Sequence, residues 1–188
     1  MSRWEPDARG RLQQAAMELY VERGFEQTTV AEIADRAGLT ERTFFRHFAD
    51  KREVLFAGSS VLQDLFVSTV AGLPEGSSPL AAVEAAVAAA AAVLEERPDW
   101  SRERFAVITA NAALQERELT KMASLAAAVG EALRRRGVQE PAASLTAEAG
   151  IAVFRVAYER WIAAGTERDF ADLVRDSFAE LRAVTARS

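Results

Sequence analysis

Two short helical segments separated by Gly38 constrain this chain more than any other part of its sequence. The first opens at Thr29, which fits a capping box with Glu32 because each side chain can accept a hydrogen bond from the backbone N–H of the other residue. Gly38 can take a positive φ and end this helix, and Thr40 can cap the next one. The first helix is therefore only about two turns long, and a second short helix follows it directly.

The second short helix is expected to have an apolar face and a polar face. Phe44 and Phe48 are spaced i and i+4, so they can anchor the helix in a core. The outward positions carry side chains that can donate to bases or phosphates: Arg42, Thr43, Arg46 and His47. With the helix expected over residues 7–23 in front, the pattern is typical of a DNA-binding helix-turn-helix. An ordinary corner of an α-helical bundle fits the same pattern.

The charge of the chain limits how such a helix could bind DNA. A net charge of −5 argues against a surface that binds nucleic acid everywhere, because phosphate binding requires concentrated Lys and Arg. Basic residues are nevertheless concentrated in one short segment, at Arg42, Arg46, Lys51 and Arg52. We therefore expect a local basic edge on an acidic protein.

The run from Thr28 to Leu55 resembles the signature of the TetR family of transcriptional regulators. The run reads TTVAEIADRAGLTERTFFRHFADKREVL, and the signature is usually written T-x-x-x-I-A-x-x-A-G-V-S-x-x-T-L-Y-x-H-F-x-S-K-E-x-L. The resemblance implies DNA-contact positions for Thr43, Phe45, His47 and Lys51, and a phosphate-facing position for Thr29. Family members often carry tyrosine where this chain has Phe45, which lacks the hydroxyl for a phosphate hydrogen bond. The predicted DNA-binding residues are Thr28, Thr29, Thr40, Arg42, Thr43, Phe45, Arg46, His47 and Lys51.

The composition predicts an all-α protein of the cytoplasm. Apolar residues make up 49% of the chain, alanine is abundant, and there are only 5 prolines, which favours helices over strands. The chain has no cysteine, so it needs no oxidising compartment, and its first residues contain no apolar segment of a signal peptide. The longest apolar stretch, residues 85–94, is too short to span a membrane. We expect no membrane association.

The helical pattern predicts about nine helices in two domains. Residues 1–52 would form a three-helix helix-turn-helix DNA-binding domain, and residues 53–188 a helical effector-binding and dimerisation domain. A long helix is predicted from residue 51 or 52 to about 71, with a break over residues 72–79, where two prolines and two glycines prevent its continuation. Its expected buried side consists of Val54, Leu55, Val61, Leu62, Leu65 and Phe66. The further helices are predicted over residues 80–96, 101–111, 115–136, 143–164 and 170–184.

The last two predicted helices carry apolar stripes that fit a dimer interface. Small and branched side chains let helices approach closely, which favours a two-fold interface of four helices. The predicted interface residues are Leu145, Ala149, Val153, Val156, Phe170, Val174 and Phe178. The family resemblance likewise implies that the C-terminal helices dimerise and hold a small effector. Burial of the same stripes within one subunit is the alternative.

An effector pocket would be apolar with a few convergent polar groups. The candidates lie on predicted helices that are mostly apolar but contain a few isolated polar or aromatic residues. They are Trp100, Arg104, Phe105, Ile108, Asn111, Phe154, Arg155 and Tyr158. Three stretches, residues 103–108, 114–119 and 132–137, loosely resemble the C-terminal domain of the mycofactocin-system-regulator subgroup. That resemblance implies a small apolar or acyl-CoA-like effector.

Taken together, the sequence predicts a dimeric repressor that a small effector releases from a palindromic operator on double-stranded DNA. A TetR-like regulator without a small ligand is one alternative, and a helical binding or scaffold protein with a vestigial helix-turn-helix is another. No phosphate loop, nucleophile elbow or carboxylate pair stands out, so we expect no enzyme. His47 is the only histidine, which argues against a His-based metal site, and no cofactor is expected.

Overall fold

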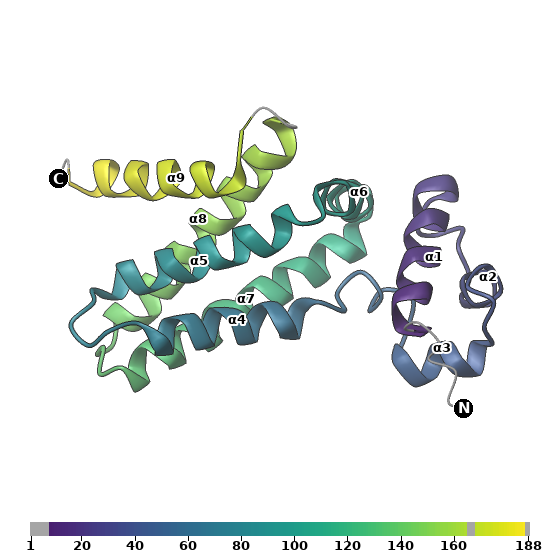
Figure 1. Ribbon diagram of the computed structural model, residues 1–188, viewed down its shortest axis with the longest axis horizontal. Helices are drawn as coiled ribbons and strands as arrows, with labels where there is room; N and C mark the ends of the chain where they lie inside the picture. Colours follow the sequence, from purple (N-terminus) through teal and green to yellow (C-terminus); the bar gives the residue numbers. More distant parts are fainter. Residues whose placement is uncertain (1–7, 165–167, 187–188) are drawn as a thin grey trace. The chain divides into compact units, whose positions relative to one another are not determined.

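The computed structural model describes residues 8–164 and 168–186, which form nine α-helices and no strand (Figure 1). The helices are α1 (Ala8–Arg23), α2 (Val30–Arg36), α3 (Glu41–His47), α4 (Ser59–Gly72), α5 (Pro79–Glu95), α6 (Pro98–Thr109), α7 (Ala112–Arg135), α8 (Ala142–Ala164) and α9 (Phe170–Thr185). The all-α prediction is confirmed. Asp7, where the first helix is predicted to begin, lies outside the described residues. None of the helices over the described residues is long and apolar enough to cross a bilayer.

The chain divides into two compact units. The N-terminal unit comprises residues 1–58 and 102–116, and the C-terminal unit comprises residues 59–101 and 117–188. The first unit is thus built from two separate stretches of chain. Nothing in the sequence pattern indicated that residues 102–116 belong with the helix-turn-helix, and the predicted boundary between residues 52 and 53 stays a prediction.

In the N-terminal unit, α1, α2 and α3 pack on one another around a small core. The helix-turn-helix has the predicted local signals. Thr29 Oγ1 accepts from the backbone N–H of Glu32 at 3.3 Å, and Glu32 Oε2 accepts from the N–H of Thr29 at 2.9 Å, which completes the capping box. Gly38 has a φ of +64°, and Thr40 Oγ1 accepts from the N–H of Thr43 at 3.2 Å. The predicted turn and both caps are confirmed.

The long helix predicted from residue 51 or 52 is wrong in its first turns, because α4 begins only at Ser59. Residues 51–58 form turns, and the Asp50 carboxylate accepts the backbone N–H groups of Arg52 at 2.8 Å and Glu53 at 3.2 Å. The side chains of residues 54–56 are all buried, so these turns pack into the core of the unit. Val61, predicted on the buried side, is 69% exposed.

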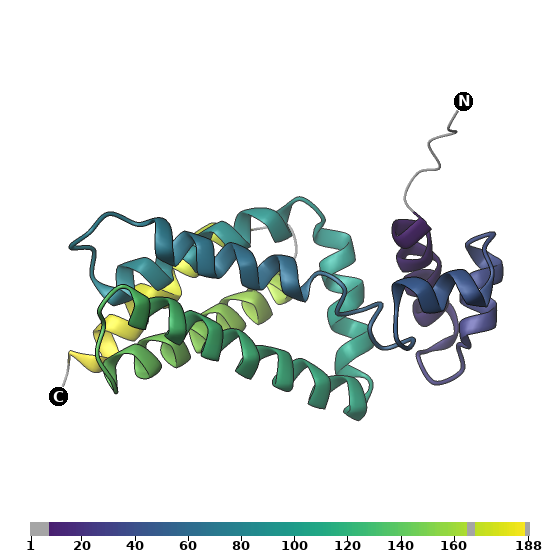
Figure 2. The ribbon, with the colours of Figure 1, turned by 90° about the horizontal axis from the view of Figure 1, so that it is seen from below.

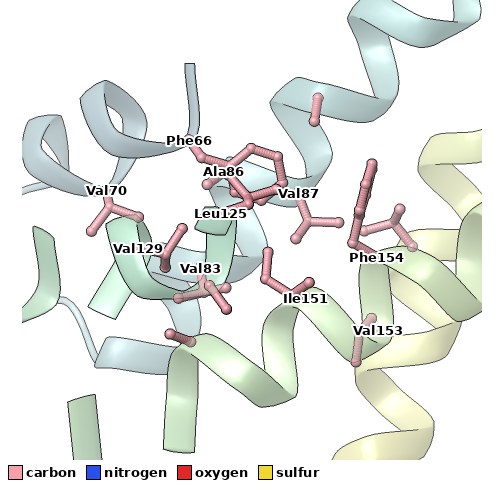
Figure 3. Close-up of a cluster of buried hydrophobic side chains, with 14 of the residues drawn as sticks. Phe66, Val70, Val83, Ala86, Val87, Leu125, Val129, Ile151, Val153 and Phe154 are labelled. Atoms are coloured by element: carbon pink, nitrogen blue, oxygen red, sulfur yellow. The ribbon is translucent and has the colours of Figure 1, made fainter. Parts of the chain in front are cut away.

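In the C-terminal unit, α5 packs against α4, α8 and α9 (Figures 1 and 2). Its alanines and valines at helical spacing are fully buried, and they meet aromatic and branched side chains from α4, α7 and α8 (Figure 3). The predicted break before α5 is confirmed, since Ser78 caps this helix and Pro79 stands in its first turn. The two helices α5 and α8 approach so closely at Gly150 that a Cβ built there would lie 2.0 Å from Val83 Cγ1.

Candidate nucleic-acid interface

Helix α3 has the two faces that a DNA-reading helix needs. Phe44 and Phe48 are both buried, and their ring centroids lie 5.5 Å apart, so they anchor the helix as predicted. Arg42 and Arg46 are exposed, and neither side chain has a hydrogen bond or ion pair with another described residue. The two guanidinium groups are therefore available for an external partner.

Three other arginines of the N-terminal unit have acidic partners. The pairs are Arg23 with Glu32 at 2.8 Å, Arg36 with Glu22 at 2.9 Å, and Arg52 with Asp50 at 2.6 Å. The hydrogen bond from Arg36 lowers the pKa of Glu22, and that from Arg52 lowers the pKa of Asp50, so both carboxylates stay ionised. The charges of these three arginines are thus compensated by carboxylates, whereas those of Arg42 and Arg46 are not. Helix α3 therefore carries a local basic surface despite the acidic total.

Lys51 binds the loop between α1 and α2, a role that differs from the predicted DNA contact. Its Nζ donates to the backbone oxygens of Phe25 and Thr28, both at 2.8 Å, and of Glu26 at 3.3 Å. The ammonium also lies 4.4 Å from the centroid of the Phe25 ring. Since an ammonium has three donors, the loop between α1 and α2 uses all of them.

We expect the replacement Lys51→Met to destabilise the protein by about 2–3 kcal/mol, because it removes hydrogen bonds from a charged donor to three carbonyl groups. The matched control is Arg52→Met, whose exposed ion pair should be worth less than about 1 kcal/mol. Thermal melting followed by circular dichroism measures both. An unchanged melting temperature for Lys51→Met would show that the lysine does not hold the loop.

The four threonines predicted to contact DNA differ in their placement. Thr28 is buried and its hydroxyl donates to the backbone oxygen of Gly24 at 2.9 Å, so it does not form part of the surface. Thr29 and Thr40 are exposed, and their hydroxyls are engaged in the caps. Thr43 is half-buried, with its hydroxyl 3.1 Å from that of Thr40.

Of the two remaining predicted residues, Phe45 lies on the surface, whereas the unpartnered ring nitrogen of His47 is buried. His47 is half-buried, and its Nε2 has no hydrogen-bond partner among the described residues. Phe45 is 56% exposed, although phenylalanine is ordinarily buried. The sequence reasoning missed Arg11, which donates through Nε to the backbone oxygen of Ala37 at 3.1 Å and so fastens α1 to the turn of the helix-turn-helix.

The structure divides the predicted effector residues between the two units. Arg104, Phe105, Ile108 and Asn111 belong to the N-terminal unit, whereas Trp100, Phe154, Arg155 and Tyr158 belong to the C-terminal unit. Phe154 and Tyr158 lie in an aromatic cluster with Phe170, and the Tyr158 hydroxyl donates to the backbone oxygen of Ser101 at 2.9 Å. Arg155 is exposed and pairs with Glu159 at 3.4 Å.

The predicted dimer residues fall into two groups, one buried within the chain and the other exposed or half-buried. Phe170, Val174 and Phe178 are fully buried because α9 packs them against α5 and α8 of the same chain. For these three residues, the burial fits the alternative of cover within one subunit better than a contact with a second copy. Val153 is also buried. By contrast, Leu145 and Val156 are 66% and 43% exposed, and Ala149 is half-buried.

Comparisons with known proteins agree with both units. The family "Bacterial regulatory proteins, tetR family" matches residues 12–57, and the family "MftR C-terminal domain" matches residues 77–186. The regulator TcmR of Streptomyces glaucescens is 40% identical over 78 residues, which are 42% of this chain and 34% of TcmR. The chain thus matches about a third of the length of that relative.

Solved structures extend the similarity over the whole fold. FadR of Thermus thermophilus, a TetR-family repressor solved with lauroyl-CoA, is 26% identical with a TM-score of 0.58 and covers 91% of each chain. A TetR-family regulator from Syntrophomonas wolfei has a TM-score of 0.69 at 12% identity over 95% of each chain, which shows a shared fold. Because one family match alone covers more than half of the sequence and the other covers the helix-turn-helix, the chain belongs to the TetR family of bacterial transcriptional regulators.

Proposed function

We propose that this regulator is a dimeric repressor that binds a palindromic operator through α3 and is released by a small apolar or acyl-CoA-like effector. The observation that carries the proposal is the pair of unpartnered guanidiniums on a helix whose opposite face is anchored by Phe44 and Phe48. Arginine can pair bidentately with guanine edges or bind phosphate, and an anchored helix presents it without further ordering.

Selection of binding sites from random double-stranded DNA tests the DNA-binding part. The expected result is an enriched palindrome whose half-sites lie about 34–36 Å apart and whose affinity falls with salt. A library with no enriched sequence over a range of salt concentrations would contradict the proposal and favour a helical binding protein with a vestigial helix-turn-helix.

The dimer is proposed to form on the exposed face of α8. Leu145, Ala149, Ala152 and Val156 are spaced by four, three and four residues, which places them on one stripe of the helix. Leu145 and Val156 are exposed although they are apolar, and Ala149 and Ala152 are small enough for a second helix to approach closely. This stripe replaces the buried residues of α9 in the proposed interface.

We expect Leu145→Glu to convert the dimer to a monomer, because it places a charge within an apolar contact. Leu119→Glu is the matched control, since Leu119 is 65% exposed on α7 and lies outside the stripe. Light scattering on size-exclusion chromatography measures the mass of each variant. A soluble dimer of Leu145→Glu would show that α8 does not form the interface.

The acyl-CoA part of the proposal is supported by the likeness of the C-terminal unit to the MftR C-terminal domain and of the whole fold to FadR, which was solved with lauroyl-CoA. An effector releases DNA only if it binds the DNA-free conformation more tightly than the bound one. Titration of a protein–operator complex with lauroyl-CoA should therefore release DNA, whereas CoA alone should not. Absence of both binding and release would favour a regulator without a small ligand of this class.

A further inference from the structure

Phe45 is the one aromatic side chain that is exposed among residues 8–164 and 168–186. More than half of its surface is accessible, and it lies on α3 rather than at a frayed end of the chain. The edge-to-face contact with Phe44, at 5.5 Å between centroids and 83° between planes, supports the ring from behind. The ring is therefore held in place and presented outward.

The residues that share a helix face with Phe45 indicate which partner its ring would contact. Arg42, Phe45 and Arg46 are spaced i, i+3 and i+4, so they share one face of the helix. Both arginines are unpaired, and their charge directs this face toward DNA phosphates and base edges. When the two guanidiniums engage DNA, the phenyl ring beside them is brought to the same surface.

The chemistry of the ring selects its target on DNA. A phenyl group has no donor or acceptor, so it cannot hydrogen-bond to a phosphate or to a polar base edge. The apolar group that the major groove displays is the C5 methyl of thymine. We propose that Phe45 contacts a thymine methyl in each half-site and is a specificity-determining residue of this regulator. This inference rests on the proposed DNA-binding function and adds a base preference to it.

Single replacement of each operator thymine by deoxyuridine tests the contact, because it removes the methyl and leaves base pairing unchanged. With the full-length protein and the selected operator, one position in each half-site should lose affinity about fourfold, the effect of one methyl-sized apolar group. The variant Phe45→Ala should bind the parent operator more weakly and lose the discrimination at that position alone. Phe45→Tyr retains the ring and should keep the discrimination.

The outcomes separate this inference from the function on which it rests. Failure to select any operator would overturn the proposed function, and the inference with it. An operator whose half-sites contain no methyl-sensitive thymine, or one at which Phe45→Ala keeps the same ratio of thymine to deoxyuridine affinity, would overturn only the inference. Circular dichroism checks that Phe45→Ala retains the wild-type melting temperature, which is expected for an exposed side chain.

Discussion

Replacing both Arg42 and Arg46 by alanine is expected to weaken operator binding by roughly 100-fold or more, since a well-placed arginine contributes about 1–3 kcal/mol. The expected loss is large because these two side chains are exposed and unpaired on α3, while Arg23, Arg36 and Arg52 are committed to carboxylates. The fold should be unaffected, because neither residue takes part in the core that Phe44 and Phe48 form.

A gel-shift or fluorescence-anisotropy titration at several salt concentrations measures this loss. If the arginines bind phosphates, the slope of log affinity against log salt should become shallower by about 1 for each phosphate that the variant no longer neutralises. If they read guanines, discrimination between operator variants should fall instead. The charge-matched control is the pair Arg135→Ala and Arg155→Ala, which removes two exposed arginines from the C-terminal unit. Equal losses for both double variants would mean that total charge, rather than α3, governs binding.

Gly150→Ala is expected to destabilise the protein by about 3 kcal/mol, at the upper end of the cost of overpacking a core. A Cβ at this position would lie 2.0 Å from Val83 Cγ1, and Val83 is itself fully buried on α5. A β-branched side chain on a helix has essentially one favourable χ1 rotamer, so Val83 cannot rotate away without strain. The helices α5 and α8 would have to separate. Chemical denaturation followed by circular dichroism measures the free energy of unfolding.

Two further variants make this prediction specific. Gly130→Ala on α7 is the matched control, because a Cβ there meets only ordinary contacts, at 3.6 Å from Arg134 and 3.7 Å from Ala147. It should stabilise the helix by up to about 1 kcal/mol, as alanine generally does in place of a helical glycine. Val83→Ala should partly restore the stability of Gly150→Ala. Strictly additive effects of Val83→Ala and Gly150→Ala would show that the two side chains do not compete for the same space.

The parts of the fold that the sequence predicted well depend on local chemistry. Thr29 and Glu32 cap a helix through atoms three residues apart, and Gly38 ends it because glycine can adopt a positive φ. The residues that determine where this helix starts and ends therefore all lie within a short stretch of sequence. The anchoring role of Phe44 and Phe48 likewise follows from their helical spacing. These features could be predicted without knowing the rest of the structure.

The sequence was least informative where the contacts that decide the structure lie far along the chain. An apolar stripe shows that Phe170, Val174 and Phe178 are buried, but the spacing does not say whether the cover is α5 and α8 or a second copy. The charge of Lys51 suggested a solvent-exposed contact, whereas its ammonium binds carbonyl groups 23 to 26 residues away. The apolar run at residues 54–56 has the right composition for a helix, and nothing in its spacing indicates that it forms turns.

The two-part construction of the N-terminal unit has a practical consequence for dissecting this regulator. Arg104 Nε donates to the backbone oxygen of Leu55 at 2.8 Å with its guanidinium over the Phe56 ring, and Asn111 Nδ2 donates to Glu26 Oε1 at 2.6 Å. A fragment that ends at Gly58 would lack these partners and leave that side of its core uncovered. A chimaera that exchanges the DNA-binding unit between relatives therefore has to transfer residues 102–116 together with the first 58 residues. Otherwise, residues 102–116 have to be changed so that they pack against the new N-terminal segment.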